Sequence, residues 1–180
     1  MPQPAPTPSV GAALTDSELE YWTGRYAQVV EAEQTGGRPF VVVSLGGERF
    51  AIGLQDLDEV AGVTSGIALP HVSPLVLGLA NVRGELLPLL DTAALLGVGG
   101  GYRLGVANRT LVVRDRRGRR TGLPVDGIES VEELNPNAFQ TAGEGEATAP
   151  IRRGGVGEHR GLALSLLDVT PLREGNFSHF

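Results

Sequence analysis

The segment RGELLPLLD (residues 83–91) returns as RGLALSLLD (residues 160–168), 77 residues further along a chain of 180 residues. The two copies share the Arg-Gly pair, three leucines and the final aspartate. An Arg-Gly pair between apolar runs is typical of a tight turn, and the leucine-rich run is typical of a buried strand. The aspartate then stands where it can accept hydrogen bonds from the free N–H groups of a following helix. We expect two similar half-domains around a shared core.

Short strand-like segments surround both copies of the repeat. Residues 40–45 and 48–52 flank Gly46-Gly47, a pair that favours a two-residue hairpin turn. Further strands are expected at residues 63–69, 77–82, 85–90, 110–114, 119–125, 128–134, 151–155 and 162–167, and short helices at 54–60, at 91–96 and around Leu172. Because no long helices alternate with these strands, the pattern predicts an all-β chain of the barrel type.

Residues 1–38 differ from the rest of the chain. A Pro/Ala-rich leader is followed by apolar residues at helical spacing, namely Leu19, Trp22, Tyr26, Val29 and Val30. This pattern predicts an N-terminal amphipathic helix, whose apolar stripe either packs on the following domain or binds a partner. The segment holds five acidic and two basic residues, so it is more acidic than the remainder. It lacks the basic and apolar regions of a signal peptide, and we expect a cytoplasmic chain without direct membrane insertion.

The composition excludes several kinds of chemistry. The chain has no cysteine, and all 15 of its basic residues are arginine. Thiolate catalysis, disulfides, sulfur-ligated metals and lysine Schiff bases are therefore ruled out. The net charge of −6 argues against a nucleic-acid-binding domain.

The remaining candidates for catalysis or metal binding are weak. His71, His159 and His179 are scattered without metal-ligand spacing, so no metal site is expected. The glycine-rich residues 97–102 lack both the third glycine and the following helix of a dinucleotide fingerprint. Asp91 and Asp168 are better explained as helix caps than as paired catalytic carboxylates. We expect no catalytic residues, no cofactor and no enzymatic activity.

Two arginine-containing turns are candidates for protein recognition. Residues 114–120 place five arginines on a hairpin tip without aromatic residues for base stacking, so an acidic patch on a protein is a better partner than nucleic acid. In the second turn, Asn81 and Gly84 suit a left-handed backbone, whereas a turn does not require Arg83. A guanidinium held on a rigid hairpin beside an apolar surface is typical of a recognition anchor.

At these residues the sequence resembles the CheW family of bacterial chemosensory adaptors. The resemblance rests on FVVVSLGGERFAI (residues 40–52), LDEV (residues 57–60), GLANVRG (residues 78–84) and both copies of the repeat. It implies a CheW-like domain over residues 39–174, with an extension at 1–38 and a tail at 175–180. It also implies a fold of two interleaved five-stranded SH3-like barrels with short helices.

The family resemblance implies a non-catalytic adaptor with two kinds of partner. One is the CheW-like regulatory domain of a chemosensory histidine kinase, and the other is the cytoplasmic tip of a chemoreceptor helical hairpin in a membrane-associated array. By position, the receptor-coupling residues are Glu59, Asn81, Arg83 and Gly84, with Leu54, Leu57, Val60 and Val82 as apolar neighbours. The kinase-facing residues are not assigned. The departure at Ala61, where many members carry arginine, affects this receptor surface.

Two other functions stay open at this stage. The chain is also compatible with a CheW-like adaptor of a pilus or surface-sensing pathway. A small-molecule-binding β-barrel is the alternative from a different class, and only the glycine loop and the arginine cluster favour it.

Overall fold

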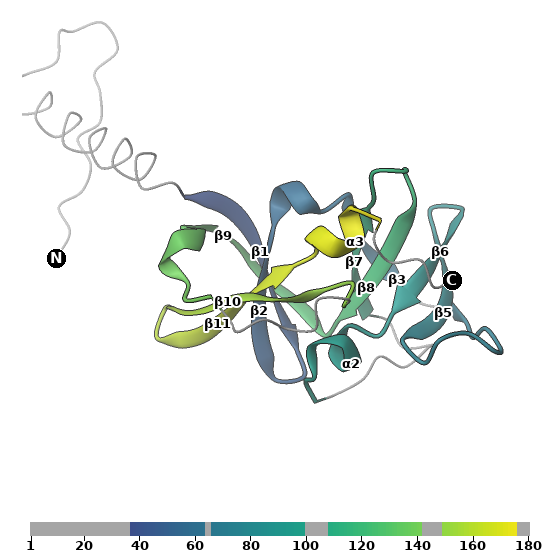
Figure 1. Cartoon of the computed structure of the whole chain (residues 1–180), viewed down its shortest axis with the longest axis horizontal. Helices are drawn as coiled ribbons and strands as arrows, with labels where there is room; N and C mark the ends of the chain where they lie inside the picture. The colour runs from purple at the N-terminus through teal and green to yellow at the C-terminus, as the bar shows by residue number, and fades with distance from the viewer. Residues whose placement is uncertain (1–36, 64–65, 100–107, 142–148, 176–180) are drawn as a thin grey trace, which may run out of the picture. The chain divides into compact units, whose positions relative to one another are not determined.

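The computed structural model describes residues 37–63, 66–99, 108–141 and 149–175 (Figure 1). From Arg38 onwards these residues belong to a single unit. The expected N-terminal helix, residues 100–102 of the glycine-rich loop and the end of the C-terminal tail lie outside the described residues.

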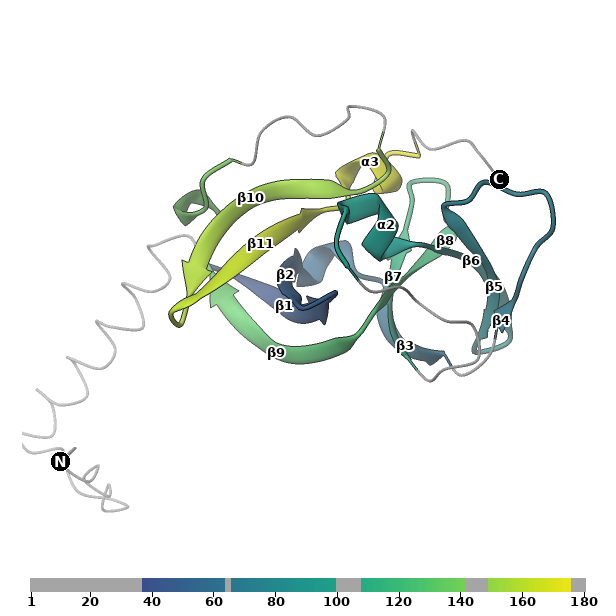
Figure 2. The same ribbon diagram turned by 90° about the horizontal axis from the view of Figure 1, so that it is seen from below.

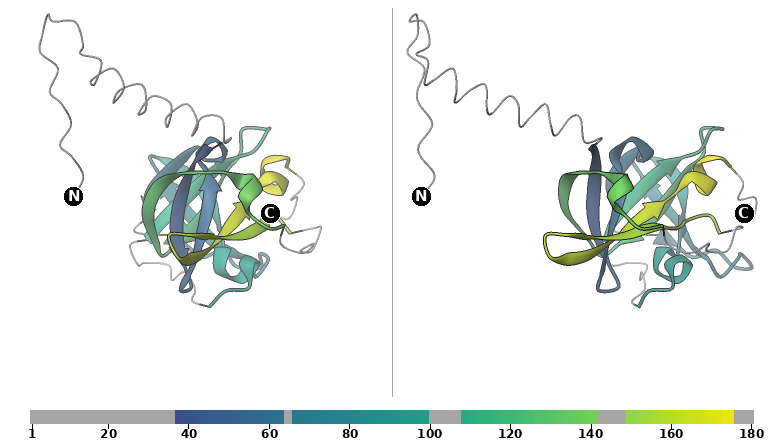
Figure 3. Two further views of the ribbon diagram at one scale, coloured as in Figure 1. Left: turned by 90° about the vertical axis from the view of Figure 1, so that its left-hand side faces the viewer. Right: turned by 60° about the vertical axis from the view of Figure 1, so that its left-hand side comes forward.

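Five strands form the first sheet, in the order β10-β11-β2-β1-β9. They are β1 (Arg38–Leu45), β2 (Glu48–Gly53), β9 (Gly127–Leu134), β10 (Arg152–His159) and β11 (Leu162–Asp168). Figure 3 shows the purple β1 and β2 between the green β9 and the yellow-green hairpin of β10 and β11.

The second sheet is built from the middle of the chain, in the order β3-β7-β8-β6-β5-β4. Its strands are β3 (Glu59–Val63), β4 (Gly66–Ile67), β5 (Val76–Val82), β6 (Glu85–Leu90), β7 (Asn108–Arg114) and β8 (Arg120–Val125). The chain leaves the first sheet after β2 and returns to it at β9, so the two sheets are interleaved. The hairpins β5–β6 and β10–β11 lie at opposite ends of the domain (Figure 2).

The internal repeat is confirmed in three dimensions. The orders β9-β1-β2-β11-β10 and β3-β7-β8-β6-β5 match strand for strand, and both run through two antiparallel pairs, one parallel pair and a further antiparallel pair. The ladder of β5 and β6 is interrupted between Val76 and Gly78, and that of β10 and β11 between Arg153 and Gly155. These interruptions lie 77 residues apart, as do the two sequence copies. The two halves therefore share local irregularities as well as topology.

The hairpin turns have the left-handed conformations that their residues predict. Gly46 and Gly47 have φ of 60° and 82°. The Arg83-Gly84 turn has φ of 53° and 88°, and the Arg160-Gly161 turn has φ of 55° and 76°. Two successive positive φ angles give a turn whose twist matches that of the flanking strands.

Both repeat aspartates bind a free amide at the next helix start, but only Asp91 stands at the N-cap position, since Val169 holds that position before α3. Asp91 precedes α2 (Thr92–Leu96) and accepts a hydrogen bond from the Ala94 amide at 3.0 Å. Asp168 accepts one from the Thr170 amide at 2.9 Å, at the start of α3 (Thr170–Arg173). Neither carboxylate acts with the other, since each serves its own half of the domain.

Three local predictions were wrong. The expected helix at residues 54–60 is only the 3₁₀ turn η1 (Leu54–Asp56), because the Asp58 amide donates to the Val112 carbonyl and β3 begins at Glu59. The expected strand at 63–69 is divided between the end of β3 and the short β4, which adds a sixth strand to this sheet. The strand expected at 151–155 is longer than expected and ends at His159. Phe139 packs over Gly157 in the added part of the strand, where the missing side chain leaves room for the ring.

The core has three parts. The main cluster lies between the sheets and includes Phe50, Ile52, Leu90 and Leu111, all fully buried. A smaller cluster around Val42 and Leu164 fills the first barrel, and one around Val63, Val82 and Leu87 fills the second. Burial of each such aliphatic or aromatic side chain contributes roughly 1.5–3 kcal/mol. The second 3₁₀ turn, η2 (Pro136–Ala138), follows β9.

Candidate functional site

Arg83 projects from the turn between β5 and β6. The Asn81 side-chain oxygen accepts a hydrogen bond from the Gly84 amide at 2.8 Å and so holds the turn. The Arg83 side chain is 81% exposed, and its Nε lies 2.9 Å from Glu59 Oε2 on β3. β3 and β5 contact each other without a ladder between them, and we call this gap the seam of the second barrel. The ion pair of Arg83 with Glu59 bridges the seam.

A second arginine lies beneath the Arg83–Glu59 pair. Arg120, at the start of β8, is only 9% exposed and forms an ion pair with the other oxygen of Glu59. Its Nη1 lies 2.6 Å from Glu85 Oε2, and its Nε lies 2.8 Å from Asp58 Oδ2. Asp58 is also held by both Nε and Nη2 of Arg114, at 2.9 and 3.0 Å.

We call these six residues the ionic cluster: Asp58, Glu59, Arg83, Glu85, Arg114 and Arg120. Its formal charges balance. The hydrogen bond from Arg114 is the main reason that the pKa of Asp58 lies below its usual 3.8. The hydrogen bond to Glu85 is the largest contribution that raises the pKa of Arg120. Asp58 and Arg120 therefore stay ionised throughout the neutral pH range.

Val60 lies next to Glu59 in β3 but on the opposite face. It is paired with Leu111 of β7, a member of the main core, and directly opposite residues of a ladder share a face. Val60 is nonetheless exposed, because β3 is the edge strand of its sheet. One strand thus presents an apolar side chain on one face and the ionic cluster on the other.

Two exposed apolar residues of β9 also lie on the face of the main core. Val131, 61% exposed, is paired with Val41, and the exposed Ile128 is paired with Val43. A spacing of three residues would normally place Ile128 and Val131 on opposite faces of a strand. A β-bulge opposite Val42 and Val43 brings both onto the face of the main core. We call Leu54, Val60, Ile128 and Val131 the apolar face: all four are exposed large apolar residues, and the last three pair in their ladders with residues of the main core.

The expected receptor residues are divided between these features. Glu59 and Arg83 belong to the ionic cluster, while Asn81 and Gly84 shape its turn. Leu54 and Val60 belong to the apolar face, and Leu57 is partly buried against the main core. Val82 is different, since it is 3% exposed inside the second barrel. The expectation that Val82 lies on this surface is wrong, because alternation along β5 turns it inward.

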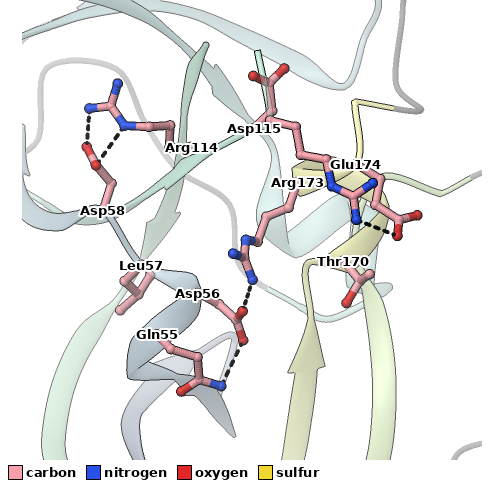
Figure 4. A pocket seen from close by; sticks show the side chains of 10 residues that line it. Gln55, Asp56, Leu57, Asp58, Arg114, Asp115, Thr170, Arg173 and Glu174 are labelled. Carbon is pink, nitrogen blue, oxygen red and sulfur yellow. Dashed lines mark hydrogen bonds and ion pairs between the residues drawn. The ribbon is translucent and has the colours of Figure 1, made fainter. Parts of the chain in front are cut away.

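A charged cleft of about 350 Å³ lies where η1, the β7–β8 hairpin and α3 meet (Figure 4). Arg173 pairs with Asp56 across it, and Arg116 Nη2 lies 3.6 Å from Glu174. The Arg116 amide also donates to the Arg173 carbonyl at 2.9 Å. These contacts connect segments from both sheets, so the cleft serves as an ionic clasp between the two halves.

The arginine-rich hairpin is therefore largely engaged within the chain. Arg114 and Arg120 bind the ionic cluster, and Arg119 pairs with Asp115 at 2.7 Å. Asp115 also accepts hydrogen bonds from the Arg117 and Arg119 amides. An acidic protein partner for this hairpin stays a prediction, and Arg114, Arg119 and Arg120 already have acidic partners within the chain.

Comparisons with known proteins agree with the fold. The model of the CheW-like domain family matches residues 39–174. The chain belongs to this family. It is 28% identical, over 64% of its length and 73% of the relative, to a probable chemotaxis protein CheW of Rhizobium etli. It is 26% identical to the chemotaxis protein CheW of Klebsiella aerogenes, over 78% of this chain and 84% of that one.

A solved structure shares the fold of this CheW-like domain. The scaffolding protein TtCheW from Thermoanaerobacter tengcongensis superposes with a TM-score of 0.64 at 21% identity, covering 80% of this chain and 97% of that one. The two interleaved barrels are thus the fold of the family. At family level, CheW-like domains are non-catalytic adaptors in chemotaxis.

No group of three or more histidine, aspartate or glutamate side chains in the described parts of the CheW-like domain could hold a metal ion. Within the same residues, no helix has the length and apolar character needed to span a membrane.

Sequence reasoning missed the most buried member of the ionic cluster. Arg120 was one of five arginines on a hairpin tip, where solvated charge is the usual explanation. Its position directly before the buried segment Thr121–Val125 was the available signal, since an arginine at the start of a buried strand needs acidic partners. Ile128 and Val131 were missed because the bulge that unites them leaves no mark in the spacing of β9 alone.

Proposed function

We propose that this CheW-like domain couples a chemoreceptor to a chemosensory histidine kinase. The apolar face carries the proposal. Exposed valine and isoleucine side chains on β3 and β9 continue the main core to the surface, and the edge strand β3 carries on its other face the glutamate that pairs with Arg83. An apolar surface with charged residues at its edge suits the recognition of an amphipathic helix.

The receptor partner of the proposal is the cytoplasmic tip of a helical hairpin. Leu54, Val60 and Val131 would supply the apolar contact. Glu59 and Arg83, supported by Asn81 and Gly84, would set the register at the rim. Leu57 would support Leu54 and Val60 from below, because it packs on the main core.

The kinase partner of the proposal is a CheW-like regulatory domain that packs barrel against barrel. The balanced charge of the ionic cluster and the internal pairing of the arginine-rich hairpin leave apolar packing as the principal source of affinity. Recruitment to membrane-associated receptor arrays would follow from binding the receptor.

Direct binding tests the proposal. Purified full-length protein is titrated with a soluble chemoreceptor helical-hairpin fragment and, separately, with the regulatory domain of a histidine kinase from the same genome. We expect both to bind, and Val131→Glu to abolish receptor binding while kinase binding persists. Val156→Glu is the matched control, because Val156 is also exposed but lies on β10, at the other edge of the first sheet.

Two results would overturn the proposal. The first is that neither partner binds the wild-type protein. The second is a ligand-dependent rise in melting temperature without kinase binding, which would favour a small-molecule barrel.

A further inference from the structure

Arg83 is the most exposed member of the ionic cluster. Arg83 is a long, flexible side chain with a large rotamer entropy, and its guanidinium lies at the surface. Glu59 is the partner that holds it, through Nε at 2.9 Å. The direction of the Arg83 guanidinium therefore depends on where the Glu59 carboxylate lies.

The Glu59 carboxylate is shared between two arginines. One oxygen binds the exposed Arg83 and the other binds the buried Arg120. Glu59 itself is only 16% exposed, so solvent contributes little to its position. Arg120 is fixed in turn by two further carboxylates, from Asp58 ahead of β3 and Glu85 on β6.

We propose that Arg120 is a positioning residue for Arg83, acting through Glu59. Arg120 holds one Glu59 oxygen inward, so that the second oxygen faces the seam and orients the Arg83 guanidinium for contact with a partner. The consequence for binding rests on the proposed function, whereas the effect on Arg83 itself is a property of the free protein.

Charge balance explains why another residue does not replace Arg120. Asp58 retains Arg114 when Arg120 is removed, but the Glu59 carboxylate then loses the arginine that holds its inner oxygen. A carboxylate without that inner partner can turn, and the Arg83 guanidinium then loses the single direction that the wild-type arrangement imposes. The entropic cost of ordering the Arg83 side chain then reduces the affinity for the partner, because the side chain is no longer ordered in the free protein.

The internal repeat supplies a matched control. Gly122 of β8 pairs with Leu89, and Ala51 of β2 pairs with Leu166, while Leu89 and Leu166 hold the same position in the two repeats. Arg120 lies two residues before Gly122, and Arg49 lies two residues before Ala51. The two arginines therefore hold corresponding positions in the two barrels. Arg49 is also mostly buried and bonds Glu129 at 2.7 Å, but it lies in the other barrel.

The first test needs no partner. Nitrogen-15 NMR of the arginine Nε–H groups is recorded for wild-type protein, Arg120→Gln and Arg49→Gln. In Arg120→Gln we expect hydrogen exchange at Arg83 Nε to be up to about fivefold faster, the factor for losing an exposed ion pair worth up to about 1 kcal/mol. Arg49→Gln should leave Arg83 unchanged. Unaltered Arg83 exchange in a folded Arg120→Gln protein would overturn the proposal.

The second test is a double-mutant cycle on receptor-fragment binding. Arg120→Gln should weaken binding about tenfold in the wild-type background and have no further effect in the Arg83→Ala background. An equal loss in both backgrounds would show that Arg120 acts independently of Arg83 and would overturn the proposal. Arg120→Lys, which keeps the charge but not the fork of donors, serves if the Gln variant does not fold, and it should show the same dependence on Arg83. If the wild-type protein fails to bind the fragment, the proposed function fails, and the NMR experiment still decides the role of Arg120.

Discussion

Arg83 and Arg160 have the same position and the same task in the two halves of the domain. Each has a left-handed backbone, with φ of 53° and 55°, in a two-residue turn. Each ion-pairs at 2.9 Å with a mostly buried glutamate on the strand at the far edge of its sheet, Glu59 on β3 and Glu132 on β9. The repeat therefore places one ionic bridge across the seam of each barrel.

These two bridges should contribute little to stability. Arg83→Ala and Arg160→Ala remove side chains that are mostly exposed, and exposed ion pairs are worth up to about 1 kcal/mol. Urea denaturation should therefore give free energies of unfolding within about 1 kcal/mol of wild type for both variants. A loss well above this range in either variant would show that the bridge holds its barrel together.

The two repeat aspartates should matter more. Asp91→Ala and Asp168→Ala each remove a carboxylate that binds a free amide at a helix start, which costs about 1 kcal/mol. Asp168→Ala should cost more than Asp91→Ala, because Asp168 Oδ2 also accepts a hydrogen bond from Arg152 at 2.8 Å. Thermal denaturation of both variants measures the difference, and equal losses would contradict the added role of Arg152.

Acid should remove the stabilisation that Asp168 provides. Burial opposes ionisation of this carboxyl, but hydrogen bonds from Thr170 and Arg152 outweigh burial and hold its pKa below 3.8. A depressed pKa in the folded state stabilises the fold above the unfolded value, and the effect is lost as the pH falls through the folded value. The difference in unfolding free energy between wild type and Asp168→Asn should thus be constant near neutrality and shrink below pH 3.8. A difference that grew towards acid pH would reverse the assigned sign.

Gly122 should be intolerant of a side chain. A Cβ at this position would lie 2.5 Å from Leu89 Cδ2 and 2.8 Å from Thr110 Cγ2, inside the second barrel. Gly122→Ala should cost about 1–3 kcal/mol, because the surrounding side chains must shift. Gly154→Ala is the control, since its Cβ would meet no atom closer than 3.4 Å. Similar melting temperatures for the two variants would contradict this account of the packing.

Most of the fold could be predicted from the repeat and from turn chemistry. The segments 83–91 and 160–168 predict the same turn, strand and aspartate-bound helix start in both halves. The three predicted hairpins are found at their expected turns. The region between η1 and β5 could not be predicted, because its strands are short and their bounds depend on pairing with β7 and β5. Apolar residues at positions 54, 57 and 60 have helical spacing, yet the ladder with β7 determines the structure from Glu59 onward.

Only the exposed residues of the candidate site could be predicted from the sequence. Arg83 could be singled out because a turn does not need an arginine, and the structure places it in an exposed ion pair. The roles of Arg120 and Val131 depend on contacts between segments far apart in sequence, such as Arg120 with Glu59 and Val131 with Val41. Neither a hairpin-tip arginine nor a strand valine reveals such a contact by its local pattern.

Receptor-dependent kinase activation in a reconstituted mixture tests the central claim most directly. Full-length protein, a receptor helical-hairpin fragment and the histidine kinase are combined, and kinase autophosphorylation is measured with wild type, Arg83→Asp and Arg160→Asp. The account predicts that Arg83→Asp stays folded but loses receptor binding and kinase activation, because aspartate removes the rim cation and repels Glu59. Arg160→Asp, its counterpart in the other barrel, should retain both. Wild-type binding and activation by Arg83→Asp would contradict the account.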